Sequence, residues 1–134
     1  MTRAWPVAFG ALLLGGCPGG RAGELAGEAL RLSEAVRSLR DAPNPDKRPW
    51  LERLAETPCT SADLCELRAT CLAGYRQHGA AFSRVEALSR TLDASQADQT
   101  ARSLANAQLE LEAAHERVTE CARVEAEIRT KYRL

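Results

Sequence analysis

Two long stretches of the chain place apolar or small residues at alternating steps of three and four, and this spacing constrains the fold more than any other feature. The first stretch holds Leu64, Leu67, Cys71, Gly74, His78, Ala81, Val85, Leu88 and Leu92. The second holds Leu104, Ala107, Leu111, Ala114, Val118, Cys121 and Ile128, with Glu125 as its polar interruption. Heptad spacing of this kind predicts two long amphipathic helices that pack against each other.

A turn near residues 93–95 would fold these two helices into an antiparallel hairpin. Residues then lie opposite each other when their numbers add to about 192, because the two helices run in opposite directions from that turn. The rule pairs Leu64 with Ile128, Cys71 with Cys121, Ala81 with Leu111, and Leu88 with Leu104. Apolar side chains meet on each of these rungs, whereas Leu67 meets Glu125.

A third helix is predicted over residues 22–40, where Leu25, Ala29, Leu32, Val36 and Leu39 recur at helical spacing. Pro43 and Pro45 end it, and a short helix over residues 49–54 follows. The composition agrees, because 24 Ala against five Val and one Ile disfavours a sheet. We therefore expect an all-α fold: an elongated three-helix bundle with a long antiparallel helical hairpin, stapled by disulfides, in which residues 43–58 form a strap.

Two glycines, Gly74 and Gly79, lie inside the predicted helix of the first stretch. Each costs about 1 kcal/mol relative to Ala in a helix interior. Close approach of helix 22–40 and a kink in the helix are both compatible with this pattern.

The beginning of the chain has the pattern of an export signal. Arg3 precedes an apolar stretch over residues 4–16, which is shorter than the roughly 20 residues needed to span a bilayer. Leu14, Gly15, Gly16 and Cys17 resemble the lipobox of bacterial lipoproteins. The alternative is an ordinary cleaved signal in which Cys17 occurs by chance.

The lipobox resemblance implies that residues 1–16 are removed as a signal peptide and that Cys17 carries diacylglycerol and an N-acyl chain such as palmitate. Residues 17–23 would be a flexible tether, and residues 24–134 the helical bundle domain. Because Pro18 replaces the Asp that retains such proteins in the inner membrane, the resemblance favours the outer membrane, facing the periplasm.

Four further cysteines, Cys59, Cys65, Cys71 and Cys121, form an even set, as expected of disulfides in an oxidising compartment. Cys65 and Cys71 would lie roughly 10 Å apart on one helix, beyond the limit of about 7 Å for a bridge, and Cys59 is farther from Cys71 still. The remaining pairing is Cys59–Cys65 with Cys71–Cys121. A zinc site is the alternative, although the spacing lacks the short knuckle of structural zinc.

The sequence argues against several function classes. The 18 basic and 18 acidic residues leave no net charge to attract nucleic acid, and the aromatic residues are too few for a stacking surface. No motif of a phosphate loop, a nucleophile elbow or a metalloprotease is present. We expect neither an enzyme nor a cofactor. His78 and His115 lie on neighbouring rungs, so the alternative is a periplasmic metal or stress sensor.

The leading hypothesis is a lipid-anchored, non-catalytic envelope protein that acts as a protein-binding or structural module. Its candidate docking surface is the groove beside helix 22–40 and the strap, with Trp50, Leu51 and Leu54; Trp50 could instead close the end of the bundle. Pilotins, the small lipoproteins that escort secretin subunits, are similar in size, anchoring and helical content.

The final residues, 130–134, resemble the end of the murein lipoprotein, but the chain ends in Leu134 where that family has its linking Lys. A spacer between membrane and wall is a further alternative.

Overall fold

The computed structural model describes residues 20–90 and 97–134. Within these residues the chain forms α1 (Arg21–Asp41), the short 3-10 helix η1 (Asn44–Asp46), α2 (Lys47–Glu56), α3 (Ala62–Arg90) and α4 (Ala97–Tyr132). The predicted signal peptide, Cys17 and the turn at 93–95 lie outside the described residues.

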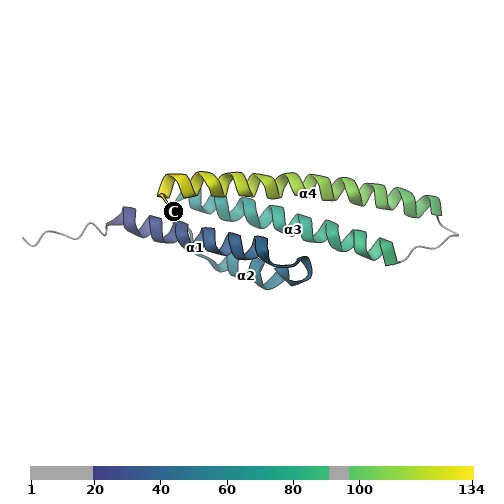
Figure 1. Ribbon diagram of the computed structural model, residues 1–134, viewed down its shortest axis with the longest axis horizontal. Helices are drawn as coiled ribbons and strands as arrows, with labels where there is room; N and C mark the ends of the chain where they lie inside the picture. Colours follow the sequence, from purple (N-terminus) through teal and green to yellow (C-terminus); the bar gives the residue numbers. More distant parts are fainter. Residues whose placement is uncertain (1–19, 91–96) are drawn as a thin grey trace, which may run out of the picture.

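The helices form an elongated bundle built on the α3–α4 hairpin (Figure 1), and this confirms the predicted fold class. The strap itself is largely helical, since α2 extends beyond the expected 49–54 at both ends. α1 begins at Arg21, so residues 21–23, assigned to a flexible tether from the sequence, are helical. α1 and α2 lie along only one part of the hairpin, the part near the C-terminus (Figure 1).

The hydrophobic core lies where α1 and α2 cover the hairpin. Leu32, Val36 and Leu39 of α1 pack with Leu64 and Leu67 of α3, and all five side chains are fully buried. The cluster also takes in Leu54, Cys71, Tyr75, Cys121 and Ile128. Several helices therefore exclude water at this end, whereas farther along the hairpin α3 and α4 are the only described helices that face each other (Figure 1).

Two disulfides join the cysteines as the spacing predicts. Cys71 and Cys121 bridge α3 and α4 with a Cα–Cα distance of 4.7 Å, and this fixes the register of the hairpin. Cys59 and Cys65 join the segment after α2 to the first turns of α3, with a Cα–Cα distance of 5.1 Å.

Gly74 allows the backbone of α4 to approach α3. A Cβ on Gly74 would lie 2.9 Å from the carbonyl oxygen of Arg117, which is too close for any side chain. The expectation that helix 22–40 or a kink explains this glycine is therefore wrong, because the close neighbour is α4 and α3 continues as one helix through both glycines. Gly79 has open space around its Cα and needs no such contact.

The polar rung of the hairpin, Glu125, attaches α1 to α4. Its carboxylate is only 4% exposed, accepts a hydrogen bond of 2.8 Å from Ser33 Oγ and forms an ion pair with Arg40. A second buried carboxylate, Glu28, accepts hydrogen bonds from the backbone N–H and the hydroxyl of Thr60, the latter at 2.7 Å. Buried charges are tolerated when they are paired in this way, and these two place α1 against α4 and against the start of α3.

Candidate functional site

The α1–α2 connection is built around one lysine. Lys47, at the start of α2, is buried and its Nζ donates hydrogen bonds to the carbonyl oxygens of Leu39 (2.7 Å), Arg40 (3.1 Å) and Ala42 (2.6 Å). These carbonyls end α1 and have no partner within the helix, and a cation there also complements the helix dipole. The ammonium also lies 5.3 Å from the ring centre of Tyr75 on α3. Lys47 therefore fixes the angle at which α2 folds back beside α1.

The three apolar residues predicted to form a docking surface do not act together. Leu54 is fully buried in the core, so the prediction that it lies on the surface is wrong. Trp50 and Leu51 are half-buried and pack against the same core from α2. The guanidinium of Arg53 covers part of the Trp50 ring at 5.7 Å from its centre. Trp50 thus belongs mainly to the outer layer of the bundle.

A groove does run beside α1 and the strap, but cationic side chains line it. Arg31, Glu34, Ala35, Arg37 and Ser38 of α1 form one wall, and Arg53, Thr57 and Pro58 form the other. We call it the α1–α2 groove. Its three arginines and one glutamate give a net charge of +2. In the part of the chain that the structure describes, none of these arginines forms an ion pair, although Arg53 contacts Trp50.

The shape and charge of the α1–α2 groove suit an anionic ligand. A guanidinium donates two parallel hydrogen bonds to a carboxylate, a geometry that an unpaired arginine leaves available. The far wall is held rigidly, because Arg68 of α3 donates a hydrogen bond of 2.8 Å to the carbonyl oxygen of Thr57 and the Cys59–Cys65 bridge follows directly.

The two histidines come together as their positions predict. His78 and His115 line one shallow hollow with Leu111, Glu112 and Glu116. Burial lowers the pKa of His78, and the nearby charges of Lys47 and His115 add to the effect. Among the residues with described positions, no group of three or more His, Cys, Asp or Glu side chains is arranged to hold a metal ion.

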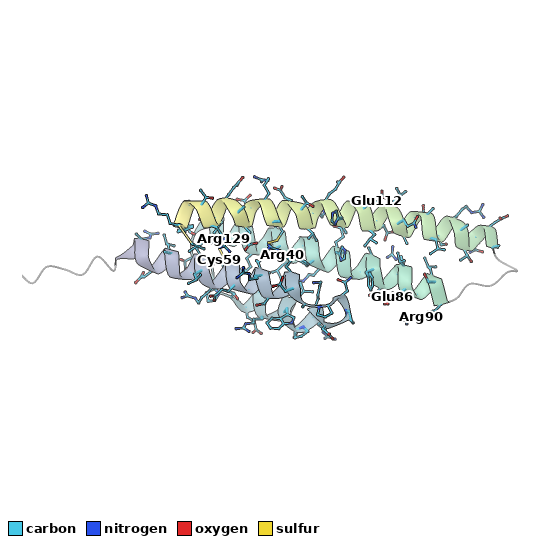
Figure 2. All side chains as sticks on the ribbon, in the orientation of Figure 1. Arg40, Cys59, Glu86, Arg90, Glu112 and Arg129 are labelled. Atoms are coloured by element: carbon cyan, nitrogen blue, oxygen red, sulfur yellow. A yellow bond between two sulfur atoms is a disulfide. The ribbon has the colours of Figure 1, made fainter. Side chains whose placement is uncertain are left out.

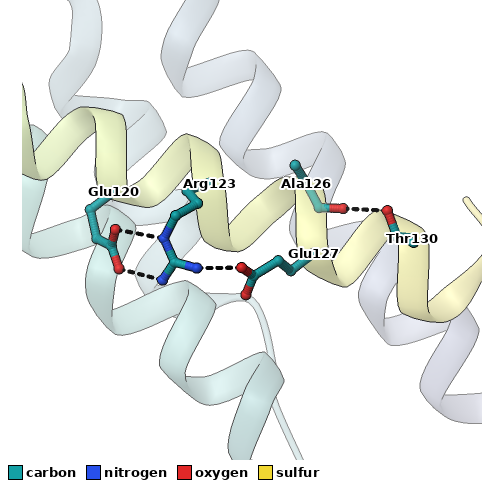
Figure 3. Close-up of polar contacts among 5 residues, drawn as sticks. All are labelled: Glu120, Arg123, Ala126, Glu127 and Thr130. Atoms are coloured by element: carbon teal, nitrogen blue, oxygen red, sulfur yellow. Dashed lines mark hydrogen bonds and ion pairs between the residues drawn. The ribbon is translucent and has the colours of Figure 1, made fainter.

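The acidic residues of α4 include a solvated network, as their helical spacing indicates. Arg123 donates hydrogen bonds of 2.8 and 2.6 Å to the carboxylate of Glu120 and also pairs with Glu127 (Figure 3). The hydrogen bond from Arg123 lowers the pKa of Glu120. These pairs are exposed, and each is worth little to stability.

The sequence pattern missed the residues that define the groove. Arg31, Arg37 and Arg53 look like ordinary solvent-exposed positions, since each occupies the polar face of its helix. One feature of the sequence could have indicated the groove: Arg31 and Arg37 lie on the exposed part of α1, beside which the strap at residues 43–58 has to pass. Which of the chain's arginines lack partners becomes visible only once the helices are packed.

Cys17, the residue predicted from the sequence to carry the lipid anchor, lies outside the described residues, three positions before Gly20. Among the helices of residues 20–90 and 97–134, none is both long and apolar enough to cross a bilayer.

Comparison with known proteins returns no relative: no family model, no curated protein and no solved structure matches the chain.

Proposed function

We propose that this chain is a lipid-anchored, non-catalytic helical protein of the bacterial cell envelope, which binds an acidic segment of a protein partner in the α1–α2 groove. The anchor in this proposal is Cys17 within the lipobox-like sequence Leu14-Gly15-Gly16-Cys17, and the expected location is the outer membrane facing the periplasm. The two disulfides support an oxidising compartment.

The arrangement of the helices supports this role. Two residues, Pro18 and Gly19, separate Cys17 from Gly20, and the three Cα–Cα steps of this span reach about 10 Å when fully extended. The start of α1 lies at the same end of the bundle as the chain's C-terminus, and the far end of the hairpin lies opposite (Figure 1). A lipid on Cys17 would therefore hold the covered end of the bundle, with the α1–α2 groove, near the membrane.

The single observation that carries the choice of partner is the set of unpaired arginines in the α1–α2 groove. Elsewhere in the described chain some cations have a carboxylate partner, as Arg40, Arg84 and Lys131 do, and others, such as Arg102 and Arg129, are single exposed side chains without one. Arg31, Arg37 and Arg53 instead line a concave surface together without one. An acidic peptide would supply the missing carboxylates and would contact Ala35 and Pro58 with its apolar atoms.

The chemistry of the groove is tested with a defined ligand, a fluorescein-labelled hexaglutamate peptide. We expect saturable binding to the oxidised, detergent-purified protein, weakened about tenfold by Arg37→Ala with Arg53→Ala, since each removes a charge-assisted contact. The matched control is Arg102→Ala with Arg129→Ala, which removes the same charge from exposed positions on α4. Equal weakening by both double variants would show nonspecific attraction and would overturn the proposal.

The partner itself is sought with a photo-crosslinking amino acid at position 37 in growing cells, and with the same amino acid at position 129 as the control. The proposal expects one dominant adduct specific to position 37, whose crosslinked peptide is rich in Asp and Glu. An adduct pattern identical at both positions would contradict it.

A further inference from the structure

Within residues 78–90 and 97–116, the far part of the hairpin is a two-helix arm without a core of large side chains. The continuous hydrophobic cluster ends near Tyr75 of α3 and Val118 of α4. Among the described residues beyond this point, only small ones are fully enclosed between the two helices: Ala81, Ala107 and Ala114. Several larger apolar residues of the arm, Phe82, Leu104 and Leu111, are only half-buried.

These larger residues lie on the side of the hairpin that α1 and α2 cover in the other half. Tyr75 lies against Lys47, and Glu125 binds Ser33 and Arg40 of α1. Phe82 follows Tyr75 by one heptad, and Leu111 and Leu104 precede Glu125 by two and three heptads. Positions seven residues apart share a face in packed helices, so the surface that receives α1 continues along the arm. We call the part of this surface that α1 and α2 leave uncovered, formed by Phe82, Leu104 and Leu111, the arm face.

The charges beside the arm face select among possible occupants. Residues 78–90 and 97–116 hold three arginines and five carboxylates, a net charge of −2 with neutral histidines. Arg84 pairs with Glu110, and Arg90 pairs with Glu86, which lies on the same end part of α3 (Figure 2). Glu112 and Glu116 line the hollow next to Leu111 and form no ion pair with any residue that the structure describes.

If a second copy of this chain bound to the arm face, two acidic edges would meet and repel each other. A basic, amphipathic helix from another protein would instead pair its cations with these carboxylates, and it would cover the apolar residues as α1 does in the other half. The face from His78 to Arg90 is about 18 Å long, which corresponds to three turns of helix.

We propose that the arm face binds one amphipathic α-helix of a different protein, with its apolar side on Phe82, Leu104 and Leu111 and a lysine or arginine beside Glu112 and Glu116. The helix continues the line of α1 along the hairpin and extends the three-helix packing toward the end of the arm. This binding does not depend on the α1–α2 groove, so the two proposals stand or fall separately.

The probe is a 14-residue amidated peptide of leucine and lysine at helical spacing, titrated into the oxidised protein and followed by fluorescence anisotropy. We expect saturable, one-to-one binding that is weakened about tenfold by Leu111→Ser, because one buried leucine is worth about that much. The matched control is Leu109→Ser, two residues earlier on α4, where the leucine is 63% exposed. It should change the dissociation constant less than about twofold.

Several outcomes would overturn the proposal: absence of saturable binding, equal effects of Leu111→Ser and Leu109→Ser, or a protein dimer whose formation requires Leu111. If circular dichroism shows that Leu111→Ser is unfolded, peptide binding is tested instead with the surface variant Glu112→Gln with Glu116→Gln. The proposal expects it to weaken binding at low salt and to leave little difference at high salt. Unchanged binding in this variant at low salt would contradict the proposal.

Discussion

The hydroxyl of Ser33 on α1 donates a hydrogen bond of 2.8 Å to the buried carboxylate of Glu125 on α4. Glu125 interrupts an otherwise apolar series of hairpin positions, and Arg40 of α1 pairs with the same carboxylate. The interruption therefore favours this position of α1, because it brings both Ser33 and Arg40 to the buried charge.

Glu125→Ala tests this attachment. Removing the carboxylate leaves the buried hydroxyl of Ser33 without its acceptor, and we expect the free energy of unfolding to fall by about 2 kcal/mol. Urea unfolding with both disulfides intact measures the change. The control Glu127→Ala removes an exposed carboxylate two residues farther along α4 and should cost less than about 0.5 kcal/mol. Equal costs would mean that Glu125 has no special role.

The two glycines of α3 provide a second test with opposite expected signs. Gly74→Ala forces a methyl group against the backbone of Arg117, and we expect a loss of about 1–3 kcal/mol. Gly79→Ala adds a methyl group in open space and should stabilise the protein by up to about 1 kcal/mol through helix propensity. Thermal unfolding of both variants measures the sign of each change in stability. A stabilised Gly74→Ala protein would contradict the close approach of α4.

The disulfides should contribute unequally. By loop entropy, Cys71–Cys121 stabilises the fold by about 4 kcal/mol and Cys59–Cys65 by about 2 kcal/mol. Replacing each pair by Ala and comparing urea unfolding measures the difference. Tryptic mapping without reduction checks the pairing itself, since cleavage at Arg68 separates Cys65 from Cys71. Recovery of Cys65 joined to Cys121 would overturn the register of the hairpin.

Asp63 makes the stability depend on pH. Burial by itself raises the pKa of this carboxyl, but hydrogen bonds, led by that from Lys131 at 2.7 Å, hold it below its ordinary value of 3.8. Because the folded pKa is lower than the unfolded one, the stabilisation is present above about pH 4 and is lost as the pH falls further. We expect the difference in Tm between the native protein and Asp63→Asn to be largest near neutral pH and to shrink below pH 4. A difference independent of pH would show that Asp63 does not act through its charge.

Tyr132→Phe is the partial version of that test. It removes one donor to Asp63, at 3.0 Å, and leaves the ion pair with Lys131 in place. Its pH-dependent loss should therefore have the same direction as that of Asp63→Asn and be smaller.

The fold could be predicted from local patterns because heptad spacing alone specifies which sides of α3 and α4 face each other. The same register placed Cys71 beside Cys121, so the long disulfide followed from the hairpin. Lys47 could not be predicted in this way, because its role depends on where α1 ends in space. The prediction that Leu54 lies on the surface was wrong for a related reason. A short helix between prolines has too few residues to show from its sequence which side is buried, and that side is known only when the surface it packs on is known.

The proposed function depends on a lipid anchor at Cys17, and the intact mass of the mature protein tests that anchor most directly. We predict that protein purified from bacterial membranes begins at Cys17 and carries the added mass of diacylglycerol and one acyl chain, and that Cys17→Ser removes this mass and releases the protein or leaves the signal uncleaved. A native protein that is free in the periplasm, begins at another residue and carries no lipid would contradict the account.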